Sequence, residues 1–250
     1  MKKIKYKLKK KYVIILIGLL GLIIISFVFI KVYKHYKIEK NVDDVLIKTE
    51  TNIDKDNDEI FKETKSLKNL NSDFVGILTI PDTIINYPVM YTKGQDYYLR
   101  RSFDKKYSIA GSLYIDKYNT ISPKDDNLII YGHNMKNGTM FHELLNYKEE
   151  DFYNNHKYFY FTTDEVREKY EIVSMFVSKV FYKTDKVFKY YKFYNASSEE
   201  EFNYYKENIL KLSLFDTGVE LNYKDKFITL STCDYSLENG RFVVIGKLIS

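Results

Sequence analysis

The chain has little of several residue types that mark particular protein classes. A single cysteine in 250 residues excludes an internal disulfide framework and any zinc site built from several cysteines. Only 3 prolines and 10 glycines exclude collagen-like and low-complexity chains. Hydrophobic residues make up 45% of the chain and charged residues 29%, which is enough apolar material for a core and excludes a wholly disordered protein. The length allows one ordinary domain with additional segments, or two small domains.

Positive charge is concentrated at the N-terminus. Seven of the 39 basic residues lie before residue 12, at positions 2, 3, 5, 7, 9, 10 and 11, which leaves 32 against 34 acidic residues in the whole chain. Everything after this tail is therefore close to neutral. A basic surface for nucleic acid is not indicated.

An uncharged run, Val13 to Ile30, follows the basic tail. As a helix it would extend about 27 Å, close to the hydrocarbon core of about 30 Å. A cleaved secretory signal is the alternative, but its apolar region would be shorter and a small-residue cleavage site should follow. We expect a cytoplasmic tail over 1–12 and a transmembrane signal-anchor over 13–31. The more positive flank stays cytoplasmic, which predicts a single-pass cell-membrane protein with its main domain on the extracellular face.

Residues 32–72 are expected to form a helical stalk, because most of this stretch is rich in charge and has apolar residues at patchy helical spacing. Asp54, Asp56 and Asp58 resemble the start of a calcium loop. The sixth position is Glu59 instead of Gly, and the twelfth is Lys65 instead of Glu, so an EF-hand is excluded. We expect neither a metal nor a cofactor in this protein.

From Phe74 onward, β-branched and aromatic runs alternate with turn residues, and 25 Tyr and 17 Phe favour strands. Eight such runs predict a mainly β domain over 73–250, a closed barrel or a sandwich. The runs are FVGILTI, YPVMY, GSLYID, NLIIYG, KYFYFTT, KYEIVSMFVSKVF, KFITLSTC and RFVVIGKLIS. Two helices should interrupt them, over 140–145 and over 197–212. The second carries Phe202, Tyr205, Ile209 and Leu212 on one face.

Three residues are candidates for chemistry. His133 follows a buried strand and a Gly, Cys233 ends a strand, and Arg241 opens the next strand after a tight turn. These last two strands should be antiparallel neighbours, so their side chains can converge. Each residue also has an ordinary interpretation: His133 as a loop residue and Cys233 as a small core residue. His35, His142 and His156 are weaker candidates.

Together these segments resemble one family, the sortases, and within it class B. The resemblance covers about residues 70–250 and rests on INYPVM, YYLRRSF, GSLYID, YGHNMKNGTMF and TLSTC followed by Arg241. It implies an eight-stranded sortase-type β-barrel with N-terminal helices and a long helix inserted before the strand of Cys233. It also implies a Gram-positive cysteine transpeptidase. Such enzymes cleave a C-terminal sorting motif of surface proteins after Thr and join the Thr carboxyl to an amine of a lipid II-type peptidoglycan precursor.

The resemblance also assigns roles to residues. Cys233 is the expected nucleophile, His133 the general acid and base, and Arg241 the stabiliser of the oxyanion or substrate. Four further residues match positions that line the substrate groove, namely Asn86, Met90, Ser231 and Asp234. The segment from Phe188 to Phe193 is expected to form a wall of that groove.

Two other function classes compete with this interpretation. The first class is another kind of cysteine enzyme. Papain-like proteases carry Cys before His in the chain, with the Cys on a helix, and L,D-transpeptidases have His, Gly and Cys close together in the sequence. Neither arrangement fits this chain. The other class is a non-catalytic anchored protein that uses the barrel to bind a ligand. The presence of all three catalytic residue types argues against that class.

Overall fold

A computed structural model describes the backbone of residues 2–51, 58–94 and 96–250, with side chains from residue 12 onward. It divides into two compact units, one up to Asp43 and one from Asp44 to Ser250. Asp54 and Asp56, from the rejected calcium loop, lie outside the described residues. So do the lysine side chains of the N-terminal tail.

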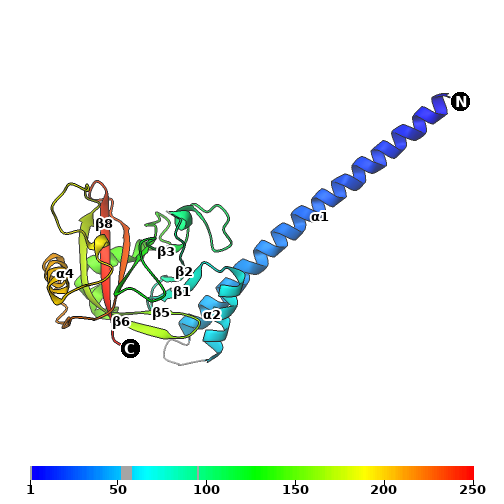
Figure 1. The fold of residues 1–250 in the computed structure, drawn as a ribbon. Coiled ribbons are helices and arrows are strands. Elements are labelled where there is room, and N and C mark those ends of the chain that lie inside the picture. Colours follow the sequence, from blue (N-terminus) through cyan, green and yellow to red (C-terminus); the bar gives the residue numbers. More distant parts are fainter. Residues whose placement is uncertain (1, 52–57, 95) are drawn as a thin grey trace. The chain divides into compact units, whose positions relative to one another are not determined.

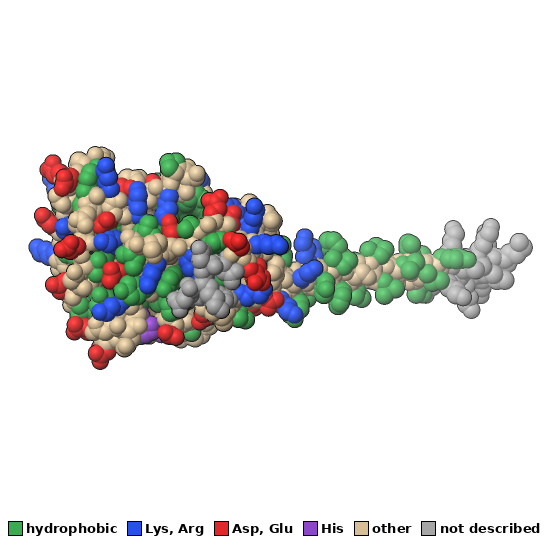
Figure 2. Space-filling view, turned by 90° about the horizontal axis from the view of Figure 1, so that it is seen from below, with side chains coloured by type: hydrophobic (Ala, Val, Ile, Leu, Met, Phe, Trp, Pro, Cys, Tyr) green, Lys and Arg blue, Asp and Glu red, His purple; other side chains and the backbone are tan. Residues whose placement is uncertain are grey.

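The N-terminal unit is formed by the long helix α1 (Lys2–Thr51), which continues into the second unit. Its most apolar 18-residue window has a mean hydropathy of 3.3 and no buried residue. Figure 2 shows hydrophobic side chains around this part of the helix. By length and composition, α1 is the one helix among the described residues that is able to cross a membrane.

Eight strands in the described part of the chain close into a barrel (Figure 1), in the order β1-β2-β3-β4-β7-β8-β6-β5. They are β1 (Phe74–Thr79), β2 (Asn86–Met90), β3 (Leu113–Ile115), β4 (Asn127–Tyr131), β5 (Tyr158–Thr162), β6 (Arg167–Lys179), β7 (Phe227–Cys233) and β8 (Gly240–Leu248). Each falls on one of the eight predicted runs. The predicted fold class is therefore confirmed, and the closed barrel is the correct choice over the sandwich.

The barrel interior is filled by alternate residues of the strands, as the two-residue period of a strand requires. This interior cluster includes Leu128 and Ile130 of β4, Ile228 and Leu230 of β7, and Phe242 of β8. The residues between them point outward. Position along each strand therefore decides which side chains are available for a site on the outer surface.

Helix α4 (Glu199–Leu212) covers part of the outer surface (Figure 1). Its N-terminus is capped reciprocally, because Ser198 Oγ accepts from Glu201 N and the Glu201 carboxylate accepts from Ser197 N. Its buried face packs with outward residues of β6, β7 and β8 in a second cluster that includes Phe202, Tyr205, Ile209, Phe227, Val243 and Ile245. The helix was predicted, but Leu212 is 41% exposed at its last residue and does not join the buried face.

Shorter helices complete the second unit. They are α2 (Asp58–Leu70), η1 (Tyr97–Arg100), η2 (His142–Lys148), α3 (Glu150–Asn155) and η3 (Tyr190–Lys192). The helix predicted at 140–145 is the 3-10 helix η2, shifted by two to three residues. The end of α1 is tied to the barrel, because Leu46 O accepts from Asn86 Nδ2 at 2.8 Å and Thr49 O accepts from Arg167 Nη2 at 3.3 Å.

Candidate active site

His133 and Cys233 are brought to one edge of the barrel by the pairing of β4 with β7. These strands run parallel with Tyr131 opposite Ser231, and Gly132 N donates to Ser231 O at 3.2 Å. Two further contacts extend the pairing: Thr232 Oγ1 donates to Gly132 O at 2.8 Å, and Asn134 Nδ2 donates to Cys233 O at 3.0 Å. The same register therefore sets His133 beside Cys233.

Arg241 reaches the same edge from the other side of β7. Strands β7 and β8 are antiparallel, and their ladder pairs Cys233 with Arg241. The expectation that these two residues lie on neighbouring antiparallel strands is confirmed. Directly opposite residues have Cβ atoms about 4.5–5.5 Å apart on one face of the sheet.

This face is the outer one, as the alternation along each strand requires. Leu230 and Phe242 point into the barrel interior, so the adjacent residues Ser231 and Arg241 point outward. Cys233 lies two positions beyond Ser231 and therefore also points outward. Farther along β7 and β8, the outer face is covered by α4. Cys233 and Arg241 stand at the uncovered end, where both are half-buried.

The ring of His133 has a fixed hydrogen-bond partner. Nε2 lies 2.9 Å from Leu99 O. A carbonyl oxygen only accepts, so Nε2 carries the hydrogen. The lone pair of the neutral imidazole is therefore on Nδ1, which is the nitrogen free to exchange a proton.

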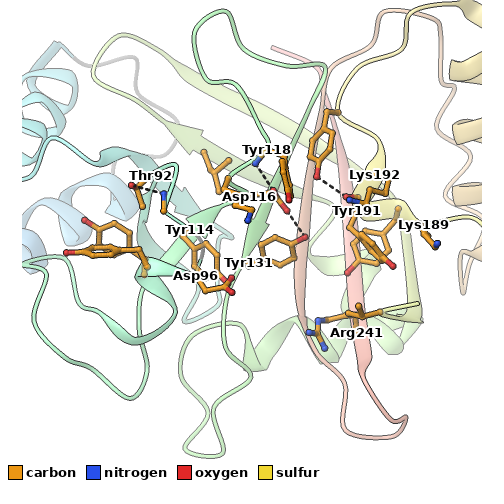
Figure 3. A pocket seen from close by; sticks show the side chains of 18 of the residues that line it. Thr92, Asp96, Tyr114, Asp116, Tyr118, Tyr131, Lys189, Tyr191, Lys192 and Arg241 are labelled. Carbon is orange, nitrogen blue, oxygen red and sulfur yellow. Dashed lines mark hydrogen bonds between the residues drawn. The ribbon is translucent and has the colours of Figure 1, made fainter. Parts of the chain in front are cut away.

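A groove of about 750 Å³ extends from Arg241 along the outer surface. Figure 3 shows it between Tyr114, Asp116 and Tyr131 on one side and Lys189, Tyr191 and Lys192 on the other. The predicted wall segment 188–193 thus contributes four lining residues, Lys189 to Lys192. A groove this rich in tyrosine offers both flat apolar surface and hydroxyl donors to an extended peptide.

The tyrosines near the site stay neutral at ordinary pH. Burial raises the pKa of Tyr114, Tyr131 and Tyr190 well above the usual value for a phenol. The positive charge of Arg241 lowers the pKa of Tyr114 and of Tyr190, and a negative charge on Cys233 raises both pKa values. These two hydroxyls therefore lie within electrostatic range of Cys233 and Arg241.

The four residues predicted to bind substrate have other contacts in this structure. Asn86 contacts the end of α1, and Met90 is fully buried. The Ser231 hydroxyl is buried against Tyr190, and the Asp234 carboxylate pairs with Lys148 at 2.6 Å. None of the four is among the residues lining the groove, and their substrate-binding role stays a prediction.

Sequence reasoning did not single out the Leu99 carbonyl, Tyr114 or Tyr131. A backbone acceptor leaves no signature in the sequence. For the tyrosines a signal existed, since each occupies an outward position in a strand next to apolar inward residues. Among the residues that the structure describes, no group of three or more His, Cys, Asp or Glu side chains is arranged to hold a metal ion.

Comparison with known proteins agrees with this geometry. The sequence model of the sortase domain matches residues 78–249. Sortase B of Listeria monocytogenes is 38% identical over 196 residues, covering 78% of this chain and 77% of the relative. Sortase B of Staphylococcus aureus is 30% identical over 245 residues, covering 96% and 98%.

Solved structures give the same result. Clostridium perfringens sortase B superposes with a TM-score of 0.67 at 34% identity, covering 74% of this chain and 99% of that one. A Staphylococcus aureus sortase B–substrate complex gives 0.72 at 25% identity, covering 88% and 98%. A sortase B complexed with triglycine gives 0.73 at 25% identity, covering 86% and 99%. With the barrel, the His133–Cys233–Arg241 edge and these relatives in agreement, the chain belongs to the sortase family of cysteine transpeptidases, and within it to class B.

Proposed function

We propose that this enzyme cleaves a C-terminal sorting motif of surface proteins after Thr and transfers the acyl group to an amine of a lipid II-type peptidoglycan precursor. One observation carries the proposal: β4 and β8 flank β7 so that His133, Cys233 and Arg241 share one edge of the barrel, and Arg241 also lines the groove. Further support comes from the related sortase B structures, one solved with a substrate and one with triglycine.

In the acylation step, the Cys233 thiolate attacks the carbonyl carbon of Thr and forms a C–S bond. Negative charge moves to the carbonyl oxygen, where the Arg241 guanidinium can donate to it. Collapse of this intermediate breaks the C–N bond. The leaving amine takes a proton from the His133 imidazolium, and the acyl group remains as a thioester on Cys233.

In the transfer step, the neutral His133 ring takes a proton from the incoming amine as the amine attacks the thioester carbon. The C–N bond forms, the C–S bond breaks, and Cys233 leaves as the thiolate. In both steps Nδ1 is the nitrogen that exchanges the proton, because Leu99 O engages Nε2–H at 2.9 Å. The same contact holds the plane of the ring while its charge changes.

The groove is proposed to bind the sorting motif in an extended form. More cationic than anionic side chains line the groove. The cationic residues are Lys117, Lys183, Lys189, Lys192 and Arg241, and the anionic ones are Asp96 and Asp116. The tyrosine surface would displace water from the peptide and from the thioester. Exclusion of water favours attack by an amine over hydrolysis.

The apolar part of α1 is proposed as a single-pass membrane anchor, with the basic tail in the cytoplasm and the barrel outside. In this arrangement the enzyme works where precursor amines and exported proteins meet. Protease treatment of intact cells would test the orientation: the barrel should be digested, and protection of the barrel would contradict it.

The function is tested with the purified full chain in detergent, a library of five-residue motif peptides and triglycine as the amine. The expected product is an amide between a motif cleaved after Thr and triglycine, identified by mass spectrometry. The Cys233→Ala variant serves as the control and should give no product. Cleavage without any amide product, at all amine concentrations, would assign the site to a peptidase instead.

A further inference from the structure

The helix η2 contacts the residue that follows each of the two reactive side chains. At its first residue, His142 Nδ1 lies 2.7 Å from Asn134 Oδ1. At its last residue, Lys148 Nζ lies 2.6 Å from Asp234 Oδ2. Asn134 follows His133 in the chain, and Asp234 follows Cys233. One short helix thus contacts both catalytic strands just past the reactive groups.

The orientation of the Asn134 amide is set by its partners. Its nitrogen faces Cys233 O at 3.0 Å, which only accepts, so its oxygen faces His142. The His142 ring must then donate from Nδ1. Asn134 is 8% exposed, so loss of either partner would leave part of a buried amide unsatisfied. The amide links η2, through Asn134, to the backbone of the nucleophile.

The contact with Asp234 fixes the chain on the other side of Cys233. The Asp234 side chain is 2% exposed, and its Oδ1 accepts from Ser236 N at 2.8 Å. Its backbone N donates to Gly240 O at 3.1 Å, across the turn that leads to Arg241. Lys148 therefore acts on the turn that joins the nucleophile strand to the strand of Arg241.

Helix η2 is itself held firmly. Leu144 and Tyr147 are fully buried in the interior cluster, and Tyr147 Oη donates to His156 O at 2.8 Å. Just before the helix, Phe141 N donates to His133 O at 2.9 Å. Because η2 is anchored in the core, it can hold the groups that it contacts in fixed positions.

We propose that η2 is a positioning brace that sets the placement of His133 relative to Cys233, with His142 and Lys148 as its two positioning residues. The brace rests on the proposed function, since it presumes that His133 and Cys233 react together. His142 acts through Asn134, and Lys148 acts through Asp234. Neither residue needs to touch the substrate.

The test compares His142→Leu and Lys148→Met with His142→Asn and Lys148→Arg in the full chain. The first pair removes the polar contacts, and the second pair retains a donor at each position. We expect the first pair to lower kcat by about 10- to 100-fold, as misplacement of reacting groups does, with peptide KM within about twofold. The second pair should recover most of kcat. Thermal unfolding establishes that each variant is folded.

Matched controls are Lys226→Met and Lys124→Met. Lys226 pairs with Asp126, and Lys124 pairs with Glu168, so each variant removes an ion pair that involves no residue of η2. Both should retain the kcat of the unmodified enzyme. Losses in the controls equal to those in the brace variants would overturn the proposal, because they would reflect general destabilisation.

A second measurement separates this proposal from the proposed function. The rate of Cys233 alkylation by iodoacetamide needs no peptide, and it should fall in His142→Leu and Lys148→Met. If the unmodified enzyme transfers no peptide but these alkylation rates fall, the proposed function fails and the brace stands. If kcat and alkylation are both unchanged in the two variants, the brace is wrong.

Discussion

The hydroxyls of Tyr190 and Ser231 lie 2.8 Å apart in a buried hydrogen bond that joins the groove wall to β7, the strand that ends at Cys233. Tyr190→Phe and Ser231→Ala should each destabilise the fold by about 1–3 kcal/mol, because one hydroxyl is left buried without its partner. The double variant should cost less than the two single costs added together. Urea unfolding of the three variants measures this coupling. A change in peptide KM confined to Ser231→Ala would instead support its predicted contact with substrate.

Cys233→Ala should abolish cleavage and transfer while the barrel stays folded. The side chain is half-buried at the end of β7, so its loss should change stability by less than about 1 kcal/mol. Mass spectrometry after incubation with peptide should show a thioester on the unmodified chain and none on the variant. A covalent peptide adduct on Cys233→Ala would mean that another residue is the nucleophile.

Arg241→Lys should be nearly as inactive as Arg241→Ala, with transfer rates about 10²–10³-fold below that of the unmodified enzyme, as for loss of an oxyanion donor. Lysine keeps the charge but lacks the planar fork of donors. The pH dependence of Cys233 alkylation provides the control. If Arg241→Ala moves that profile to higher pH, the residue controls the thiolate population and the oxyanion role loses its support.

Gly132→Ala should destabilise the barrel and slow catalysis together. A Cβ at this position would lie 2.4 Å from Leu113 Cδ2 and 2.7 Å from Phe141 Cδ2, both in the filled interior. We expect a cost of about 1–3 kcal/mol from overpacking, and a lower kcat because His133 is the next residue. At Gly94 the nearest atom would be 3.6 Å away, so Gly94→Ala should cost less than about 0.5 kcal/mol. Similar melting temperatures for both variants would contradict the argument.

Acid should remove the contribution of the Asp234 carboxylate to stability. Burial pushes the pKa of Asp234 upward, but the Lys148 ammonium and the Ser236 donors outweigh it and hold the pKa below its ordinary value. The stabilisation is therefore present above the unfolded value of about 3.9 and is lost as pH falls through the lower folded value. Asp234→Asn should cost about 1–2 kcal/mol at pH 7, since Lys148 is one-third exposed and partly screened. Urea unfolding should show this difference shrinking below about pH 4, whereas a difference constant down to pH 2 would refute the assignment.

Local signals in the sequence were sufficient for the strands and for α4. The apolar and aromatic runs mark all eight strands, and Ser198 with its following acidic residues marks the helix start. The neighbouring placement of Cys233 and Arg241 was also predictable, because a short turn joins their strands. Each of these features depends on residues that are close together in the chain.

The remaining features depend on contacts between distant segments, which a single sequence does not encode locally. The parallel pairing of β4 with β7 places His133, and nothing near His133 specifies it. The Leu99 carbonyl lies 34 residues away from the ring that it contacts. Leu212 followed the helical period but lies at the exposed end of α4, because periodicity does not show where the covered surface stops.

The pairing of β4 with β7 also has a consequence for how the enzyme acquires activity. The bond between Thr232 and Gly132 joins residues 100 positions apart. Contacts of such sequence separation must overcome the loop-closure entropy of the intervening chain, and proteins dominated by them fold slowly. Strands β5 and β6 and helix α4 all lie within that interval. His133 and Cys233 therefore become neighbours only when the seam between β4 and β7 closes, and a nascent chain has no such pair until then.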